Sequence, residues 1–342
     1  MKTMIDLRSD TVTKPSKKML EAMMNAKVGD DVFGEDPTIK ELENKAATMF
    51  GMEASLFCTS GTQTNQIAIK VHTIPGDEII CDHTSHIYRF EGGGIGFNSG
   101  SSVRLIHGDR GRITANDVLT EINPNDSHYP QTSLVSVENT ANKGGGSCYD
   151  YDELVKIKQA CNEKKLKFHM DGARLFNALI KTGETPLQHG KLFDSISICL
   201  SKGLGAPVGS LLLGSKEFIK KAHRIRKIMG GGMRQAGFLA AAGIYALDHN
   251  VNRLVEDHQK AKSLENTLSS LSYIENVMPV ETNIIIFKLP KEISNVDFLK
   301  KFSANNILAT GFGPQLIRFV THLDFTDDML TVTEAVLKRK MF

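Results

Sequence analysis

Three polar groups in this sequence stand directly after short apolar runs of the kind that form buried strands. They are the turn Ser60-Gly61-Thr62, the carboxylate of Asp171 and the amine of Lys202. In an open α/β sheet, ligands collect at the carboxyl ends of the strands, so these groups are expected at one edge. Free N–H groups at a helix start suit a phosphate, a carboxylate suits a pyridinium nitrogen, and a buried amine suits an aldehyde. The three groups therefore predict a pyridoxal phosphate site.

Each group also has an ordinary structural explanation. Ser60 and Asp171 could simply cap helices, for which serine and aspartate are common choices, and lysines in loops are usually only solvated. However, Asp171 and Arg174 lie three residues apart on one helical turn, and Gly203 and Gly205 would let another group approach the lysine closely. The order of the three groups along the chain favours a cofactor site over unrelated caps.

Other common cofactor motifs are missing from the sequence. The run from Gly203 through Gly205 to Gly209 is one residue too long for a dinucleotide fingerprint, and it leads into a strand rather than a helix. There is no P-loop and no H-E-x-x-H motif. His83 and His86 could offer two metal ligands, but they lack a third neighbour in the sequence, so no metal site is expected.

The elements that would position these groups alternate between strand and helix signals. Apolar runs typical of strands cover residues 54–58, 78–81, 102–106, 134–137, 166–170, 195–200 and 210–213. Helical periodicity lies between many of them, at 38–49, 63–71, 116–122, 151–163, 174–182 and 216–227. Several of the apolar runs lack polar alternation, as expected for parallel strands buried on both faces. This alternation predicts an α/β fold with a mostly parallel sheet.

The pattern changes near residue 245. Helices at 252–271, 296–305 and 327–338 and strands at 283–287 and 316–320 predict a smaller α+β unit. A chain of 342 residues fits about two domains. We expect an N-terminal arm and helix over 1–30, a large cofactor-binding α/β domain over 31–245 and a small C-terminal α+β domain over 246–342.

The composition of the chain indicates which kinds of partner it can bind and in which cellular compartment it works. The 41 basic and 39 acidic side chains give a net charge of +2, which provides no field to attract nucleic acid or an anionic membrane. No stretch approaches the roughly 20 apolar residues of a membrane span, and the first residues are too charged for a signal peptide. The five cysteines form no C-x-x-C pair, which favours a reducing compartment. We expect a cytoplasmic protein.

Longer runs around these groups resemble the low-specificity threonine aldolases, pyridoxal-phosphate enzymes of the fold type of aspartate aminotransferase. The matching runs are residues 5–12, 28–37, 59–63, 170–174, 200–205, 229–235 and 318–322. The resemblance therefore covers the chain from its first residues almost to its end. It implies fold type I and a homotetramer, built as a dimer of dimers, with active sites at the subunit interfaces.

The resemblance implies a cofactor role for each group at the predicted edge. Lys202 would bind the aldehyde, Asp171 the pyridinium nitrogen, and the turn from Ser60 to Thr62 the phosphate. His86 would stack on the cofactor ring.

It also implies which residues meet the substrate. Ser9, Arg174 and Arg318 resemble a clamp for the substrate carboxylate, since a guanidinium fork matches a planar carboxylate. Arg174 counts among the cofactor ligands as well. His128 matches a second active-site histidine of the family. His128 and His86 are the candidate bases for the β-hydroxyl proton, and the sequence does not choose between them.

A glycine-rich segment is implied to act across a subunit interface. Lys227 and Arg234 flank the triple glycine at 230–232, which in the family reaches an active site of another subunit. The resemblance implies that both residues bind the cofactor. Phe33 stands where relatives often carry tyrosine, which removes a hydroxyl near the site.

The implied reaction is retro-aldol cleavage of L-threonine, L-allo-threonine and related β-hydroxy-α-amino acids. Its products are glycine and an aldehyde, acetaldehyde in the case of threonine. The alternative is a β-eliminating amino-acid lyase on the same fold, which needs a different pocket and usually a longer chain. The presence of Lys202, Asp171 and Arg318 disfavours a non-catalytic scaffold.

Overall fold

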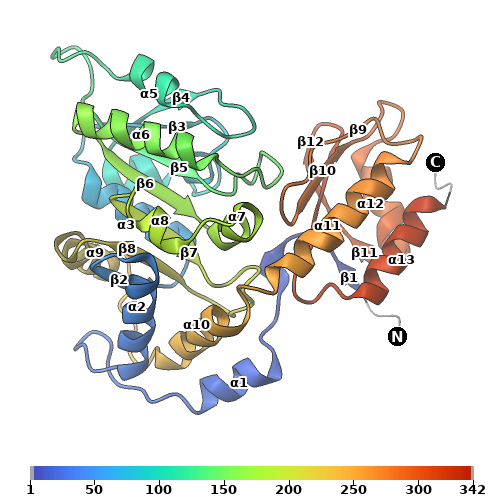
Figure 1. Ribbon diagram of the computed structural model, residues 1–342, viewed down its shortest axis with the longest axis horizontal. Helices are drawn as coiled ribbons and strands as arrows, with labels where there is room; N and C mark the ends of the chain where they lie inside the picture. The colour runs from blue at the N-terminus through green and yellow to red at the C-terminus, as the bar shows by residue number, and fades with distance from the viewer. Residues whose placement is uncertain (1–3, 340–342) are drawn as a thin grey trace.

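The computed structural model describes residues 4–339, and a seven-stranded sheet forms the middle of its large α/β region (Figure 1). The strands are β2 (Ala54–Cys58), β3 (Glu78–Asp82), β4 (Ser102–Ile106), β5 (Thr132–Glu138), β6 (Lys167–Gly172), β7 (Ser195–Cys199) and β8 (Ser210–Gly214). They lie in the order β2-β8-β7-β6-β5-β3-β4, and β8 is antiparallel to both of its neighbours. The carboxyl ends of the other strands therefore meet at one edge. The prediction of a mostly parallel α/β sheet is confirmed.

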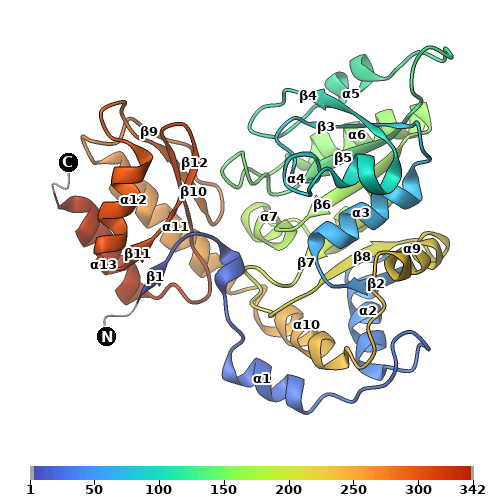
Figure 2. The same ribbon diagram turned by 180° about the vertical axis from the view of Figure 1, so that it is seen from behind.

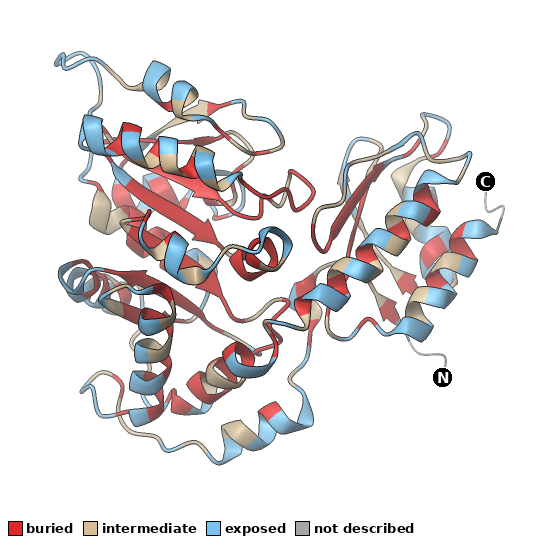
Figure 3. Ribbon diagram, in the orientation of Figure 1, coloured by how far each residue is buried: buried red, intermediate tan, exposed pale blue. Residues whose placement is uncertain are grey.

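Helices cover both faces of this sheet (Figures 1 and 2). One face carries α2 (Pro37–Phe50), α5 (Ala115–Glu121), α6 (Tyr151–Lys164), α7 (Leu175–Thr182) and α8 (Pro186–Gly190). The other face carries α3 (Gly61–His72), the short α4 (His86–Arg89), the π-helical turn η2 (Ile95–Ser99) and α9 (Lys216–Ile228). Buried residues follow the strands and the inner faces of these helices (Figure 3). The two faces differ in polarity.

The polarity follows from strand alternation. Phe168, Met170, Ile196 and Ile198 join the main apolar core on the α2 and α6 side. The side chains that alternate with them on β6 and β7 are polar and face α3. Because His169 and Asp171 on β6 and Ser195 and Ser197 on β7 are all buried, these polar side chains need partners within the protein.

The C-terminal region has its own apolar core. Its antiparallel sheet has the order β12 (Thr310–Gly313), β13 (Leu316–Val320), β10 (Ile284–Lys288) and β9 (Asn276–Val277). Helices α11 (Leu254–Ser269), α12 (Asn295–Ala304) and α13 (Asp327–Lys338) pack with it. None of the helices in residues 4–339 is both long and apolar enough to cross a membrane.

The N-terminal arm joins this C-terminal region, which the sequence does not indicate. Strand β1 (Ile5–Asp6) pairs in parallel with β11 (Ile307–Leu308), and Ile5 and Leu7 are part of the C-terminal core. After the 3₁₀ turn η1 (Asp10–Val12), the chain crosses to α1 (Lys17–Met24), which packs on α10 (Gly237–His249) of the large region. The arm thus bridges both regions.

One expected boundary falls inside a helix. Residue 245 lies within α10 (Gly237–His249), and the chain passes to the C-terminal region only between this helix and α11. Helix α10 is rich in alanine and apolar on most sides, so it lacks the periodicity that would reveal it in the sequence.

Candidate active site

The carboxyl edge of the sheet brings the three predicted groups together. Strands β6 and β7 are parallel neighbours with Asp171 opposite Ser197, so the end of β6 lies beside the segment that leads from β7 to Lys202. Helix α3 begins directly after β2 and crosses the same strands. Adjacent strands thus place an amine, a carboxylate and a helix N-terminus along one edge.

The N-terminus of α3 has the geometry of an anion site. The Ser60 hydroxyl accepts a hydrogen bond from the Gln63 N–H at 3.2 Å, which is the capping role considered for it. The N–H groups of Gly61 and Thr62, in the first turn, have no partner within the helix. A Cβ at Gly61 would lie 2.6 Å from the Cys199 Sγ, so only glycine fits this approach. These free donors suit the phosphate of the predicted cofactor.

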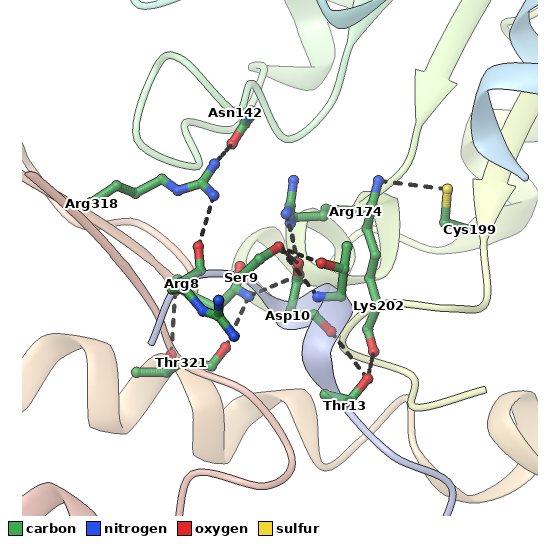
Figure 4. Close-up of polar contacts among 12 residues, drawn as sticks. Arg8, Ser9, Asp10, Thr13, Asn142, Arg174, Cys199, Lys202, Arg318 and Thr321 are labelled. Carbon is green, nitrogen blue, oxygen red and sulfur yellow. Dashed lines mark hydrogen bonds and ion pairs between the residues drawn. The ribbon is translucent and has the colours of Figure 1, made fainter. Parts of the chain in front are cut away.

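Lys202 is held at its backbone, and its amine lies inside the site. Its carbonyl accepts hydrogen bonds from the Thr13 hydroxyl at 3.0 Å and from the Gly205 N–H at 2.8 Å. Gly205 closes this turn with a φ of +77°, a conformation that favours glycine. The Lys202 Nζ donates to the Cys199 Sγ at 3.6 Å (Figure 4). The amine therefore points toward the edge at which α3 begins.

Asp171 is buried, with 2% of its surface exposed. One carboxylate oxygen accepts from the Ala173 N–H at 3.1 Å, the local cap-like contact that the sequence allows. The other accepts from the Asn65 Nδ2 at 2.9 Å. Both oxygens are thus oriented by donors, as a partner for a pyridinium nitrogen requires.

His86 lies in a group of buried carboxylates. Its Nδ1 is 2.9 Å from the Glu91 Oε1, and its backbone N–H donates to Glu138 at 2.8 Å. Burial lowers the pKa of His86, but the Glu91 hydrogen bond and the Asp171 charge outweigh this and raise it above the usual value. Burial and the nearby Asp171 raise the pKa of Glu138 to about 7.

His86, Glu91 and Asp171 are also close enough to be considered as metal ligands. Their ligand atoms lie within 4.8 Å of one another, although the sequence predicts no metal site. Their hydrogen bonds give each of them a protein partner, since Asn65 donates to both carboxylates and Glu91 pairs with the imidazole. These hydrogen bonds therefore fit a cluster in which Glu91 orients the His86 imidazole beside Asp171.

The two predicted carboxylate-binding arginines lie in different surroundings (Figure 4). Arg174 is buried and forms a double contact with Asp10, at 2.7 Å from Nε and 2.6 Å from Nη2. Arg318 donates to the Asn142 Oδ1 and to the Arg8 carbonyl, both at 2.8 Å, and its buried Nε has no hydrogen-bond partner among the described residues. Burial and the Arg174 charge lower the pKa of Arg318 to about 10.

Asp10 occupies two of the nitrogen atoms with which Arg174 could bind a substrate carboxylate. The Asp10 side chain is fully buried, and the Arg174 charge outweighs the effect of burial and holds the pKa of this carboxyl well below its usual range. Ser9, the third predicted clamp residue, caps η1 by accepting from the Thr11 N–H at 3.3 Å. The Nη1 of Arg174 makes none of the hydrogen bonds found among residues 4–339 and remains for a ligand.

His128 does not join the site of its own chain. It lies in the loop before β5, and 86% of its side chain is exposed beside Asp126. Strand β5 has seven residues, so at about 3.3 Å per residue its ends are roughly 20 Å apart. His128 precedes the amino end and Glu138 ends the strand beside Asp171. The structure therefore does not bring His128 to the other site residues of the same chain, and its role in an active site stays a prediction.

The triple glycine lies beside the phosphate site of its own chain. A Cβ at Gly231 would lie 2.3 Å from the Gln63 side chain, in the first turn of α3. Lys227 is exposed, and Arg234 pairs with Asp30 at 2.9 Å and lies over the Phe33 ring. Phe33 is itself 74% exposed, so the residue that replaces tyrosine lies on the surface of the chain.

Several residues of the site escaped the sequence analysis. They are Asp10, Asn65, Glu91, Glu138 and Asn142. Glu138 could have been found, because it directly follows the expected strand 134–137, as Asp171 follows its own strand. Asp10, Asn65 and Asn142 carry no such signal, since their partners lie far away in the sequence. Glu91 pairs with His86 five residues before it, but it follows no apolar run.

The fold and the site together define a pyridoxal-phosphate enzyme of fold type I. Solved structures share this fold. Threonine aldolase from Leishmania major superposes with a TM-score of 0.86 and 22% identity, covering 98% of this chain and 99% of that one. A putative L-allo-threonine aldolase from Listeria monocytogenes gives 0.81 and 20%, covering 97% and 95%. At these identities the likeness concerns the fold alone.

The chain belongs to the β-eliminating lyase family, whose model matches residues 6–291. It is 43% identical over 334 residues to the low specificity L-threonine aldolase of Escherichia coli (strain K12), covering 97% of this chain and 98% of that protein. It is 41% identical over 330 residues to a probable low-specificity L-threonine aldolase of Arabidopsis thaliana, covering 94% and 93%. The resemblance in the sequence motifs is confirmed, and with it the dependence on pyridoxal phosphate.

Proposed function

We propose that this protein cleaves L-threonine, L-allo-threonine and related β-hydroxy-α-amino acids to glycine and an aldehyde. One observation carries the proposal. Lys202, Asp171 and the N-terminus of α3 meet at one sheet edge, and Arg318 is buried near them without a carboxylate partner. The names of relatives about 40% identical over nearly the whole chain support the same activity.

Pyridoxal phosphate supplies an electron sink for the bond that breaks. Lys202 would provide the amine for its aldehyde, Asp171 would hold its ring nitrogen, and the N–H groups of Gly61 and Thr62 would bind its phosphate. His86, held by Glu91, would lie beside the ring.

The remaining groups bind and orient the substrate. Arg318 receives the carboxylate, assisted by Ser9 and the Nη1 of Arg174, and so aligns the Cα–Cβ bond for cleavage. His86 is the better placed of the two candidate bases, because its Nδ1 is fixed on Glu91 and its Nε2 is left for the β-hydroxyl proton.

The proposal includes a homotetramer, a dimer of dimers, with active sites at subunit interfaces. Phe33 and Ile228 are 74% and 79% exposed and lie next to Arg234 and Lys227, so a second copy of the chain would cover apolar surface there. In this proposal, His128 takes part in catalysis only in the active site of another subunit. Buried free thiols at all five cysteines support a cytoplasmic location.

Product analysis tests the reaction. The holoenzyme is mixed separately with L-threonine and L-allo-threonine, and acetaldehyde, glycine, ammonia and 2-oxo acid are measured. We expect acetaldehyde and glycine in equal amounts from both substrates. Release of ammonia and a 2-oxo acid without aldehyde would instead support the β-eliminating lyase on the same fold.

Borohydride reduction tests the role of Lys202. In the wild-type protein, reduction should fix the cofactor covalently to the peptide that contains this lysine. Lys202→Ala should lose the fixed cofactor and nearly all turnover. An unchanged fixed adduct in the variant would contradict the assignment of Lys202.

A further inference from the structure

A continuous chain of buried hydrogen bonds leads away from Asp171 between α3 and the sheet. Asn65 donates from Nδ2 to Asp171 at 2.9 Å, and its Oδ1 is 3.2 Å from the His169 Nε2. The His169 Nδ1 is 2.8 Å from the Ser195 hydroxyl, which is also 2.8 Å from the His72 Nε2. The bond that orients Asp171 is thus the last of a series.

The fold aligns the members of this series. His169 and Asp171 are two apart on β6, so their side chains share the face that α3 covers. Ser195 on β7 is paired with His169 across the sheet. Asn65 and His72 are seven apart on α3, which places both on one side of the helix about 10 Å apart. The His72 ring is stacked on Phe218 at 4.6 Å, so the far end is held in place.

The partners of Asn65 indicate one direction for each hydrogen bond in the series. The Asn65 amide nitrogen faces two carboxylates, Asp171 and Glu91, so its oxygen must face His169. The His169 Nε2 then carries the proton. Burial lowers the pKa of His169 to about 4, so the ring is neutral and its Nδ1 accepts from Ser195.

The same reasoning extends to the far end. The single hydroxyl proton of Ser195 is used on His169, so His72 must donate from Nε2. Burial lowers the pKa of His72 to about 3, which leaves it neutral as well. All four donors therefore point along the series toward Asp171, and hydrogen bonds aligned in this way strengthen one another.

We propose that Asn65, His169, Ser195 and His72 are positioning residues that hold the Asp171 carboxylate oriented for its part in the cleavage reaction. This inference rests on the proposed function, because the benefit concerns the pyridinium partner. Glu91 and Glu138 lie near Asp171, and the Asp171 charge helps to raise the pKa of Glu138. Among these acidic groups, a fixed donor keeps the Asp171 carboxylate in one orientation.

Ser195→Ala breaks the series in its middle while leaving every group at the site in place. Ser197→Ala is the matched control, because Ser197 lies on the same strand and face, is also 0% exposed and donates or accepts only with Thr64 at 2.6 Å. We expect Ser195→Ala to lower kcat for L-threonine about threefold to tenfold, or about 0.7–1.4 kcal/mol, with KM within about twofold. Ser197→Ala should retain the wild-type kcat. Equal effects of the two variants, or an unchanged kcat in Ser195→Ala, would overturn the proposal.

Nitrogen-15 NMR of the wild-type holoenzyme tests the series without any variant of Ser195. Long-range proton–nitrogen correlations of labelled histidine distinguish protonated from bare ring nitrogens, and His72→Gln and His169→Gln assign the two rings. Both should be neutral and protonated on Nε2. A proton on the Nδ1 of His169 would refute the inference even if threonine is cleaved. If the wild-type enzyme releases no aldehyde from threonine, the proposed function is wrong whatever the NMR result. The catalytic role of the four positioning residues is then wrong as well.

Discussion

The cofactor edge and the carboxylate side of the site are built in different ways. We use cofactor edge for Lys202, Asp171 and the first turn of α3, and carboxylate side for Arg318, Arg174 and Asp10. Neighbouring strands of one sheet place the groups of the cofactor edge. The carboxylate side is assembled where the arm and the C-terminal sheet meet the large region, through contacts such as Arg318 to the Arg8 carbonyl. The first depends on one sheet and the second on the docking of separate regions.

Within the carboxylate side, the two arginines show what a partner does to a buried charge. Arg174 has its counter-ion in Asp10, whose charge outweighs the burial and raises the pKa of the guanidinium. Arg318 makes no ion pair with a carboxylate of residues 4–339, and burial lowers its pKa to about 10 although the more distant Asp10 charge opposes this. A buried arginine that lacks a counter-ion gains most from an incoming carboxylate. We therefore expect Arg318 to matter more for substrate and Arg174 more for stability.

Arg318→Lys should have the largest effect on activity. Losing one member of a buried, hydrogen-bonded charge pair costs about 2–5 kcal/mol, so kcat/KM for L-threonine should fall about a hundredfold. The thermal midpoint should hardly change, because no internal counter-ion is lost. Steady-state kinetics and a melting curve measure both. An unaltered kcat/KM would assign Arg318 a purely structural role.

Asp171→Asn should act at the cofactor edge. Asparagine caps as well as aspartate, so the contact with the Ala173 N–H and the fold should survive. Removing the charge beside the ring nitrogen is worth about 1–3 pKa units, so kcat should drop at least tenfold. The protein should remain folded and coloured. Wild-type kcat in that folded variant would reduce Asp171 to a cap.

Asp10→Asn should affect activity less and stability more. It leaves Arg174 buried with only a neutral partner, and an unpaired buried charge costs about 3–5 kcal/mol. Urea unfolding should show a loss near that size, while kcat/KM changes only severalfold. The double variant Asp10→Leu with Arg174→Met should regain part of the stability, since neither charge is left alone. A double variant as unstable as the sum of its single changes would argue against a direct pair.

The smallest effect on activity is expected from two buried glutamates, which make the stability of the protein depend on pH. Burial raises the pKa of Glu138 and of Glu43 to about 7 from 4.5. The folded state therefore holds each proton more tightly than the unfolded state, so the stability is present at low pH and is lost as pH rises toward 7, by about 3 kcal/mol per group. Glu138→Gln and Glu43→Gln should each make this fall shallower in unfolding curves between about pH 5 and 7.5.

Glu43→Gln serves as the control for Glu138→Gln, because only Glu138 contacts residues of the site. Glu43 accepts only from the Phe57 N–H, whereas Glu138 accepts from the N–H groups of His86 and Asn142 at the site. Glu138→Gln alone should therefore also change kcat. If Glu43→Gln lowers kcat equally, the effect of Glu138 belongs to general stability and not to the site.

Much of the large region is predictable because its signals are local. Apolar runs fall within a residue or two of each strand, and the end of a strand is visible in the sequence at Asp171 and Lys202. Helix α10 carries no periodic signal because it is apolar on most sides. The sequence predicts the N-terminal arm but not its pairing of Ile5 with Ile307, because a two-residue strand carries no signal for its partner.

The fold class and the family follow from periodicity, strand ends and short motifs in the sequence, and the predicted cofactor edge rests on the same local signals. The pairing of Asp10 with Arg174, the lack of a carboxylate partner for Arg318 among residues 4–339 and the exposed position of His128 are visible only in the folded chain. Electrostatic partners depend on distance in space and not on position in the sequence. Residues more than 150 positions apart in the chain meet here because separate regions dock, and a one-dimensional pattern carries no record of that docking.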